Sequence, residues 1–184
     1  MGEVTLLIER AREGDREAFD RIFELLYPEL RQIAHRPLAR GARDGLIETT
    51  ALVNECYVIF IQRKALTPTD RSHFLAYSAT VMRSIIVDAA RSAHAQRHGG
   101  DVAHVTLDTH VGDSVGDAAE QILDVDEALG KLAQIDPRLA SVVEMRYFGG
   151  MTDLEIAENL GLTDRTVRRD WEKARLLLAH ALRM

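Results

Sequence analysis

The segment Thr152–Leu178 constrains the fold of this chain most, because its apolar residues recur at helical spacing on both sides of one glycine. A first helix is expected to begin after Thr152 and to end at Gly161, since glycine tolerates the left-handed conformation that a sharp turn requires. A second helix is expected to follow Thr163, which can cap it. The apolar faces comprise Leu154, Ile156, Ala157 and Leu160 in the first helix and Val167, Trp171, Ala174 and Leu178 in the second. The segment therefore predicts a helix-turn-helix.

The second of these helices carries basic residues on its outer face. An exposed helix of this kind can enter the major groove of DNA, where arginine reads guanine and neighbouring side chains bind phosphates. The candidates for DNA contact are Arg165, Thr166, Arg168, Arg169 and Lys173. An ordinary helical hairpin with a solvated basic face is the alternative, but E-I-A, a glycine in the turn and T-V-R-R after a capping threonine together favour DNA binding.

Helical patterns also extend over most of the other residues. The sequence of 184 residues contains few glycines and prolines, and no stretch of it shows the alternation of a half-buried strand. Apolar residues make up 46% of the chain, which is enough to form a packed core. The composition therefore predicts an all-α protein.

The charge of the chain limits the kind of nucleic-acid contact that it can make. A formal net charge of −6 argues against a protein that coats nucleic acid indiscriminately, so we expect a local contact or one assisted by a partner. No apolar run approaches the roughly 18 residues needed to cross a bilayer, and the sequence shows no signal peptide. We therefore expect no membrane association and a cytoplasmic location.

Four amphipathic helices are expected in the first hundred residues, and four helices can close a bundle. Asp15 can cap the second of them, in which Pro28 predicts a bend or local break near Leu25. Cys56 lies among apolar residues on a helical pattern, which indicates a buried small side chain rather than a reactive thiol. The expected helices cover residues 4–13, 16–34, 49–64 and 71–97.

An acidic stretch follows these helices. Between Asp101 and Glu127 there are eight Asp or Glu residues and no Lys or Arg, a composition typical of a mobile linker. Helical patterning resumes near residue 125, and Asp136 and Pro137 can start a further helix. We therefore expect two small helical domains joined by an acidic flexible linker. The expected ranges are an N-terminal bundle over 1–98, the linker over 99–124 and a C-terminal helix-turn-helix domain over 125–184.

Together these motifs resemble the sigma factors of bacterial RNA polymerase, specifically the two-domain extracytoplasmic-function (ECF) group. In the C-terminal half the resemblance is carried by RYFGGMTDLEIAENLGLTDRTVRRDWEKA. Within it, R-x-F-G-G and T-V-x-R-D-W are similar to one branch of that group in particular. In the N-terminal half it is carried by ALVNECYVIF and HFLAYSATVMRSIIVDAAR, so the resemblance covers nearly the whole chain.

The resemblance implies a division of labour, with core RNA polymerase and promoter DNA as partners. The segment ALVNECYVIF is similar to the helix that binds the polymerase clamp. The second N-terminal segment is similar to the promoter-melting helix, where Arg83 and Arg91 would contact DNA beside a loop over 65–74 that captures a flipped base of the minus-ten element. A plain amphipathic core helix with solvated arginines is the alternative. The helix-turn-helix would read the minus-thirty-five element. The implied polymerase-binding residues are Glu48, Thr50, Asn54 and Glu55.

The start of the polymerase-binding helix departs from the family pattern. Most ECF sigma factors have an acidic cluster just before the leucine–valine pair, whereas this chain has Glu48, Thr49, Thr50 and Ala51 there. Because the branch is often associated with serine/threonine protein kinases, we hypothesise that phosphorylation of Thr50, or as a second choice Thr49, restores the missing charge. Such a switch would require no anti-sigma protein. The alternative is that one of the two threonines only caps the helix.

Two other classes of function were compared with this one. A conventional helix-turn-helix regulator, with an N-terminal bundle that senses a ligand or dimerises, would bind duplex promoter DNA by itself. An enzyme has little support, since the seven histidines show no metal-ligand spacing and the sequence has neither a glycine-rich phosphate loop nor a nucleophile beside a base. We therefore expect no catalytic activity, no cofactor and no metal.

Overall fold

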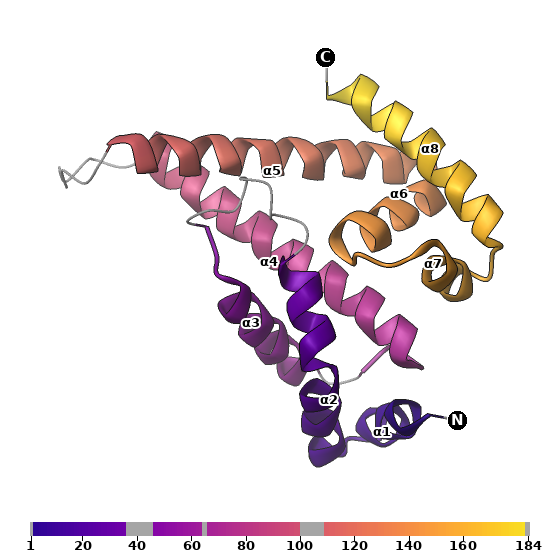
Figure 1. Ribbon diagram of the computed structural model, residues 1–184. Coiled ribbons are helices and arrows are strands. Elements are labelled where there is room, and N and C mark those ends of the chain that lie inside the picture. The colour runs from indigo at the N-terminus through magenta and orange to yellow at the C-terminus, as the bar shows by residue number, and fades with distance from the viewer. Residues whose placement is uncertain (1, 36–45, 64–65, 100–108, 183–184) are drawn as a thin grey trace.

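The computed structural model describes residues 2–35, 46–63, 66–99 and 109–182, without the side chains of residues 98–99 and 109–116 (Figure 1). Within these ranges the chain forms helices and no strand, which confirms the all-α prediction. The elements are α1 (Glu3–Arg12), α2 (Arg16–His35), α3 (Thr49–Gln62), α4 (Arg71–Gly99), α5 (Thr109–Ile135), α6 (Pro137–Val143), the π-helical turn η1 (Glu144–Phe148), α7 (Asp153–Leu160) and α8 (Asp164–Ala181).

Helices α1 to α4 form the N-terminal part of the fold, as predicted. Asp15 caps α2, because its carboxylate accepts a hydrogen bond from the backbone N–H of Ala18 at 3.0 Å. Aromatic side chains of α2, α3 and α4 form a cluster. The ring of Phe23 lies 5.5 Å from that of Phe60 and 5.6 Å from that of Phe74, and both pairs meet edge to face. Aromatic contacts of this geometry join α2 to α3 and α4.

Helix α2 continues through Pro28, so of the bend or local break predicted near Leu25 the break is wrong, and the bend stays a prediction. Proline removes one backbone N–H, and its ring crowds the carbonyl one turn earlier. Buried side chains flank it on both sides, however, so packing against the other helices holds the two parts of α2 together. These side chains are Phe23, Leu26, Leu30 and Ile33.

The predicted linker over 99–124 also differs from the structure. Helix α5 begins at Thr109, so residues 109–124 are helical, while residues 100–108 lie outside the described part of the chain. Ala118, Ala119 and Ile122 are buried and share one face of α5. The acidic composition concealed this face, because Asp117, Glu120 and Asp124 beside these residues are exposed.

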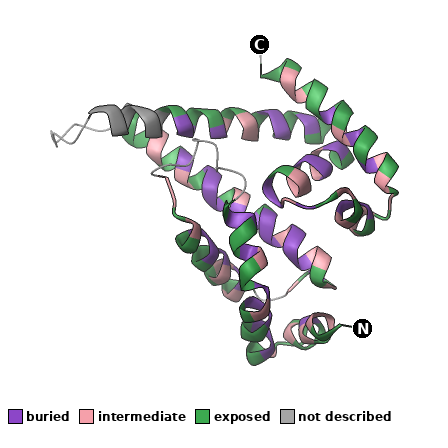
Figure 2. Cartoon of the chain, viewed as in Figure 1, coloured by how far each residue is buried: buried purple, intermediate pink, exposed green. Residues whose placement is uncertain are grey.

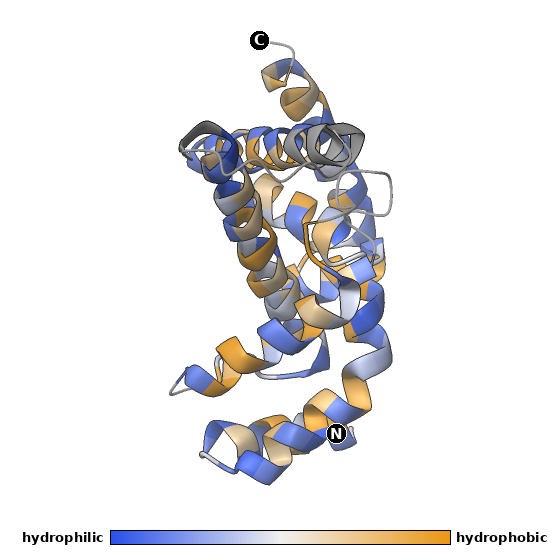
Figure 3. Ribbon diagram, turned by 90° about the vertical axis from the view of Figure 1, so that its left-hand side faces the viewer, coloured by the Kyte–Doolittle hydropathy of each residue, from blue (hydrophilic) through white to orange (hydrophobic). Residues whose placement is uncertain are grey.

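Helix α4 lies at the centre of the fold, and buried residues recur along both α4 and α5 (Figures 1 and 2). One core extends from Ile8 in α1 through α4 to Ala174 in α8. A smaller cluster under the helix-turn-helix includes Ala76 of α4 together with Val142 and Ile156. Hydrophobic and hydrophilic residues alternate along the helices, as their amphipathic patterns predict (Figure 3). The two predicted domains thus share one core, and their division by function stays a prediction.

The turn that leads into the helix-turn-helix depends on two glycines. In η1 the backbone N–H of Gly149 donates to the carbonyl of Glu144 at 3.0 Å, which closes a π-helical turn. A Cβ atom at Gly149 would lie 2.5 Å from the carbonyl oxygen of Met145, too close for any other residue. Gly150 then adopts a φ of 58°. The glycine pair therefore sets the direction in which the chain enters α7.

Candidate nucleic-acid interface

Helices α7 and α8 form the predicted helix-turn-helix with the predicted caps. The Thr152 hydroxyl accepts from the N–H of Glu155, whose carboxylate accepts from the N–H of Thr152, so the two residues form a capping box. Gly161 ends α7 with a φ of 65°, and Thr163 caps α8. The predicted position of Leu154 on the buried face of α7 is wrong, because Leu154 is 66% exposed. Leu154 lies in the first turn of α7, and the buried residues of that helix are Ile156 and Ala157.

The five candidate DNA-contacting residues lie toward the outer side of α8. The side chains of Arg168, Arg169 and Lys173 are 64, 75 and 63% exposed, and Arg165 is exposed as well. Thr166 is half-buried, and its hydroxyl lies 3.0 Å from that of Thr163. The structure therefore brings these residues together on one surface. Their contact with DNA stays a prediction.

Arg168 is engaged within the protein. It forms ion pairs with Asp164 on its own helix and, at 3.4 Å, with Asp153 at the start of α7. Asp153 also pairs with Arg146 of η1 at 2.7 Å, and that guanidinium lies 4.9 Å from the centre of the Trp171 ring. This network joins both helices of the motif to η1. Arg165 and Arg169 are consequently better placed than Arg168 to read bases.

Asp170 anchors α8 and was not singled out in the sequence. Its side chain is 3% exposed, and its Oδ2 atom lies 2.8 Å from Nε of Arg138 in α6, while Nη2 of Arg138 donates to Oδ1 at 3.3 Å. The available signal was its spacing, since position 170 falls on the same inward face as Val167 and Ala174. The pair fixes the orientation of α8 relative to α6.

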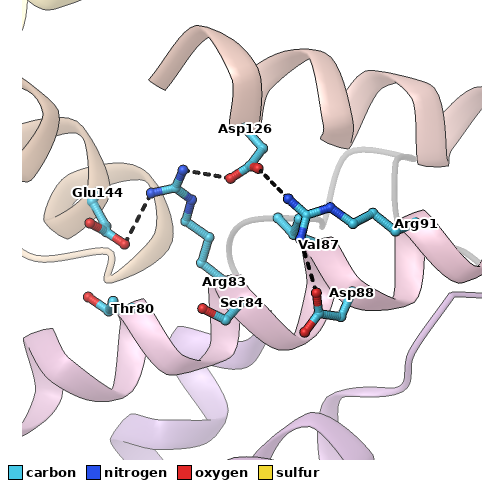
Figure 4. Close-up of a pocket in the computed structure, with 8 residues that line it drawn as sticks. All are labelled: Thr80, Arg83, Ser84, Val87, Asp88, Arg91, Asp126 and Glu144. Atoms are coloured by element: carbon cyan, nitrogen blue, oxygen red, sulfur yellow. Dashed lines mark hydrogen bonds and ion pairs between the residues drawn. The ribbon is translucent and has the colours of Figure 1, made fainter. Parts of the chain in front are cut away.

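The two candidate arginines of α4 lie where α4 meets α5 and η1 (Figure 4). Nη2 of Arg83 donates to Oδ1 of Asp126 at 2.6 Å, and Nη1 donates to Oε1 of Glu144 at 3.3 Å. Arg91 lies 3.4 Å from Oδ2 of the same Asp126 and 3.2 Å from Asp88. These groups line a pocket of about 380 Å³. Both arginines are therefore bound to the C-terminal half of the same chain.

The predicted polymerase-binding residues lie on one exposed face of α3. Glu48, Thr50, Asn54 and Glu55 are all exposed, whereas Thr49 is half-buried. Glu48 occupies the N-cap position of α3, and its side chain makes no capping hydrogen bond. The N-cap position is therefore taken by Glu48 and by neither threonine, and phosphorylation of Thr50 or Thr49 stays a prediction. On the opposite face Cys56 is fully buried, and burial raises the pKa of its thiol to about 12.

The described residues form neither a metal-binding cluster nor a membrane-spanning helix. Their side chains include no group of three or more His, Cys, Asp or Glu residues that could hold a metal ion. None of the helices described is long and apolar enough to span a membrane.

Comparison with protein families settles what kind of protein this is. The family model described as ECF sigma factor matches residues 1–184. The chain belongs to the ECF sigma factor family. None of the curated proteins matches the sequence.

Family membership gives this ECF sigma factor a role in promoter-directed transcription, with core RNA polymerase and promoter DNA as partners. It confirms the resemblance to ECF sigma factors that the sequence segments of both halves indicated. Because the match extends over both halves of the chain, it favours a sigma factor over a conventional helix-turn-helix regulator. The family is also not a family of enzymes.

Proposed function

We propose that this ECF sigma factor binds core polymerase through the exposed face of α3, contacts the minus-ten element with α4 and reads the minus-thirty-five element with α8. The observation that carries the proposal is the outer face of α8, where Arg165, Arg169 and Lys173 are exposed on a helix whose start is fixed by a cap. Such a helix fits the major groove of duplex DNA.

The role of α8 is tested by promoter-specific transcription with core polymerase. Replacing Arg165 or Arg169 with alanine removes a side chain that can bind guanine in a bidentate manner, a contact of about 1–3 kcal/mol. We expect transcription to fall at least about fivefold in each variant. Arg175→Ala is the matched control, because Arg175 is also exposed on α8 but pairs with Glu172 near the far end of the helix. Wild-type transcription by both test variants would remove α8 from the role.

The role of α3 is tested by binding to core polymerase. Glu48 and Glu55 are exposed carboxylates on the face that we assign to the polymerase clamp. Glu55→Lys reverses one charge there, so binding to a basic surface should weaken by a like-charge contact. Glu24→Lys is the control, since Glu24 is 70% exposed on α2. Equal binding by the two variants would contradict the assignment.

We further propose that a serine/threonine kinase regulates this face by phosphorylating Thr50, with Thr49 as the second choice. Thr50 lies exposed in the first turn of α3, on the same side of the helix as Asn54. A phosphate there would add about −1.5 to −2 charges close to the positive end of the helix dipole. It could then pair with arginine or lysine of the clamp. In this scheme no anti-sigma protein is required.

The switch is tested by comparing unmodified and kinase-treated protein in core-polymerase binding and transcription. We expect treatment to strengthen binding of the wild type, Thr50→Ala to abolish the response, and Thr49→Ala to retain it. Equal activity of the unmodified protein, Thr50→Ala and the treated protein would reject the switch and leave the sigma-factor role intact.

A further inference from the structure

We propose that the free protein is held closed by Asp126 and Glu144, which occupy the arginines of α4 in place of DNA phosphates. The inference rests on the proposed contact between α4 and promoter DNA. In the free protein, contact between α4 and DNA competes with the ion pairs that Asp126 and Glu144 make with α4. The two halves must therefore separate before a DNA strand can lie along α4.

The geometry of the junction supports competition for the same donors. Arg83 gives one guanidinium nitrogen to Asp126 at 2.6 Å and another to Glu144 at 3.3 Å. Arg91 reaches the second oxygen of Asp126 at 3.4 Å. Carboxylate and phosphate oxygens are the two anionic partners that a guanidinium binds in this manner. A DNA phosphate that binds through the same two guanidinium nitrogens must therefore displace Asp126 and Glu144 from Arg83.

The burial of the junction shows that these ion pairs are not incidental surface contacts. The side chains of Arg83, Asp126 and Glu144 are only 19, 24 and 21% exposed. The Arg83 guanidinium also lies 5.6 Å from the centre of the Phe148 ring. Around it, the buried Val87 of α4 and Leu129 of α5 belong to one core. Covering of α4 by α5 and η1 is thus supported by charge and by apolar packing.

The consequence for DNA binding follows from the populations of two states. In the closed state Asp126 and Glu144 bind the arginines of α4, and in the open state the two halves of the protein are separated. A ligand that binds only the open state has an apparent affinity reduced by the fraction of molecules that is open. Neutralising both carboxylates would leave the charge of Arg83 without an anionic partner in a mostly buried position, which favours opening because water can then solvate the guanidinium. The free wild-type protein should therefore bind single-stranded DNA more weakly than a variant without the two carboxylates.

The test uses the full-length free protein and a labelled single-stranded oligodeoxynucleotide of mixed sequence, with binding followed by fluorescence anisotropy. The test variant is Asp126→Asn/Glu144→Gln. The charge-matched control is Asp124→Asn/Glu127→Gln, because both residues are exposed on α5 and line a different pocket, together with Lys131 and Ala181. We expect about tenfold tighter binding by the test variant than by the control. Adding Arg83→Ala and Arg91→Ala to the test variant should remove this gain.

Two further measurements keep the outcome decisive. Circular dichroism checks that the test variant keeps its helices, and Asp126→Asn alone serves as a milder variant that should show part of the gain. Equal affinity of the test and control variants, with helices intact, would overturn the closed state. Core-dependent transcription separates this failure from failure of the proposed function. If the sigma-factor role is wrong, no variant transcribes, whereas if only the closed state is wrong, transcription remains and the oligonucleotide affinities are equal.

Discussion

Arg138 and Asp170 form one ion pair, yet we expect unequal effects when each is replaced with alanine. Arg138→Ala leaves the carboxylate of Asp170, which is 3% exposed, without its main partner. Asp170→Ala leaves the guanidinium of Arg138, which is 47% exposed and can be solvated by water. The member of the pair that remains, rather than the pair itself, should therefore determine the loss of stability.

The magnitudes follow from the burial of the group left behind. Breaking a buried ion pair costs about 3–5 kcal/mol when an uncompensated charge stays buried. Arg169 lies 3.9 Å from Asp170 and offsets a part of this, so we expect about 3 kcal/mol for Arg138→Ala. Asp170→Ala should cost only the charged hydrogen bonds, about 1.5 kcal/mol. The predicted difference of about 1.5 kcal/mol is slightly more than tenfold in the unfolding equilibrium.

Urea unfolding of the full-length protein, followed by circular dichroism, measures both values. The double variant completes a thermodynamic cycle, and its loss should be close to that of Asp170→Ala rather than to the sum of the two single losses. Equal losses, or a larger loss for Asp170→Ala, would refute the reasoning that the remaining charge sets the cost.

Four other predictions concern single residues. Gly149→Ala should destabilise the fold by about 1–3 kcal/mol, because the new Cβ atom would meet the Met145 carbonyl at 2.5 Å. Gly130→Ala, which meets no atom within 4 Å inside a helix, should stabilise it by about 0.5–1 kcal/mol, and urea midpoints compare the two. The N–H of Ala18 and the Arg10 side chain lower the pKa of Asp15 below 3.8. The hydrogen bonds to the ionised carboxylate therefore stabilise the folded protein above pH 3.8, and this stabilisation is lost as the pH falls through the lowered pKa of Asp15. The acid dependence of unfolding should consequently be shallower in Asp15→Asn. Because burial raises the pKa of the Cys56 thiol to about 12, alkylation near neutral pH should be slow in the folded protein and fast in urea, and rapid alkylation of the folded protein would contradict its burial.

Features set by neighbouring residues were predictable from the sequence. Thr152, Gly161 and Thr163 act within three or four positions of themselves, and their caps and turn are found as expected. The start of α5 was not predictable in the same way. Its acidic composition is typical of a linker, but helix formation there depends on the packing of Ala119 and Ile122 in the common core.

The same distinction between local and long-range features applies to the candidate site. The exposed basic residues of α8 followed from helical periodicity, which depends only on spacing. The partners of Arg83 did not, because Asp126 is 43 positions and Glu144 61 positions further along the chain. The mechanism proposed for closing the protein is therefore visible only once α4, α5 and η1 are placed together.

The central claim is that this protein acts as a sigma factor, and reconstitution with purified core RNA polymerase tests it most directly. The full-length protein is mixed with core enzyme lacking any sigma factor, and complex formation and run-off transcription from genomic promoter fragments are measured. We predict a stable complex and transcription from specific promoters, with little binding of duplex promoter DNA by the protein alone. Failure to bind core enzyme, together with specific binding of duplex DNA by the free protein, would contradict the account and indicate a conventional helix-turn-helix regulator.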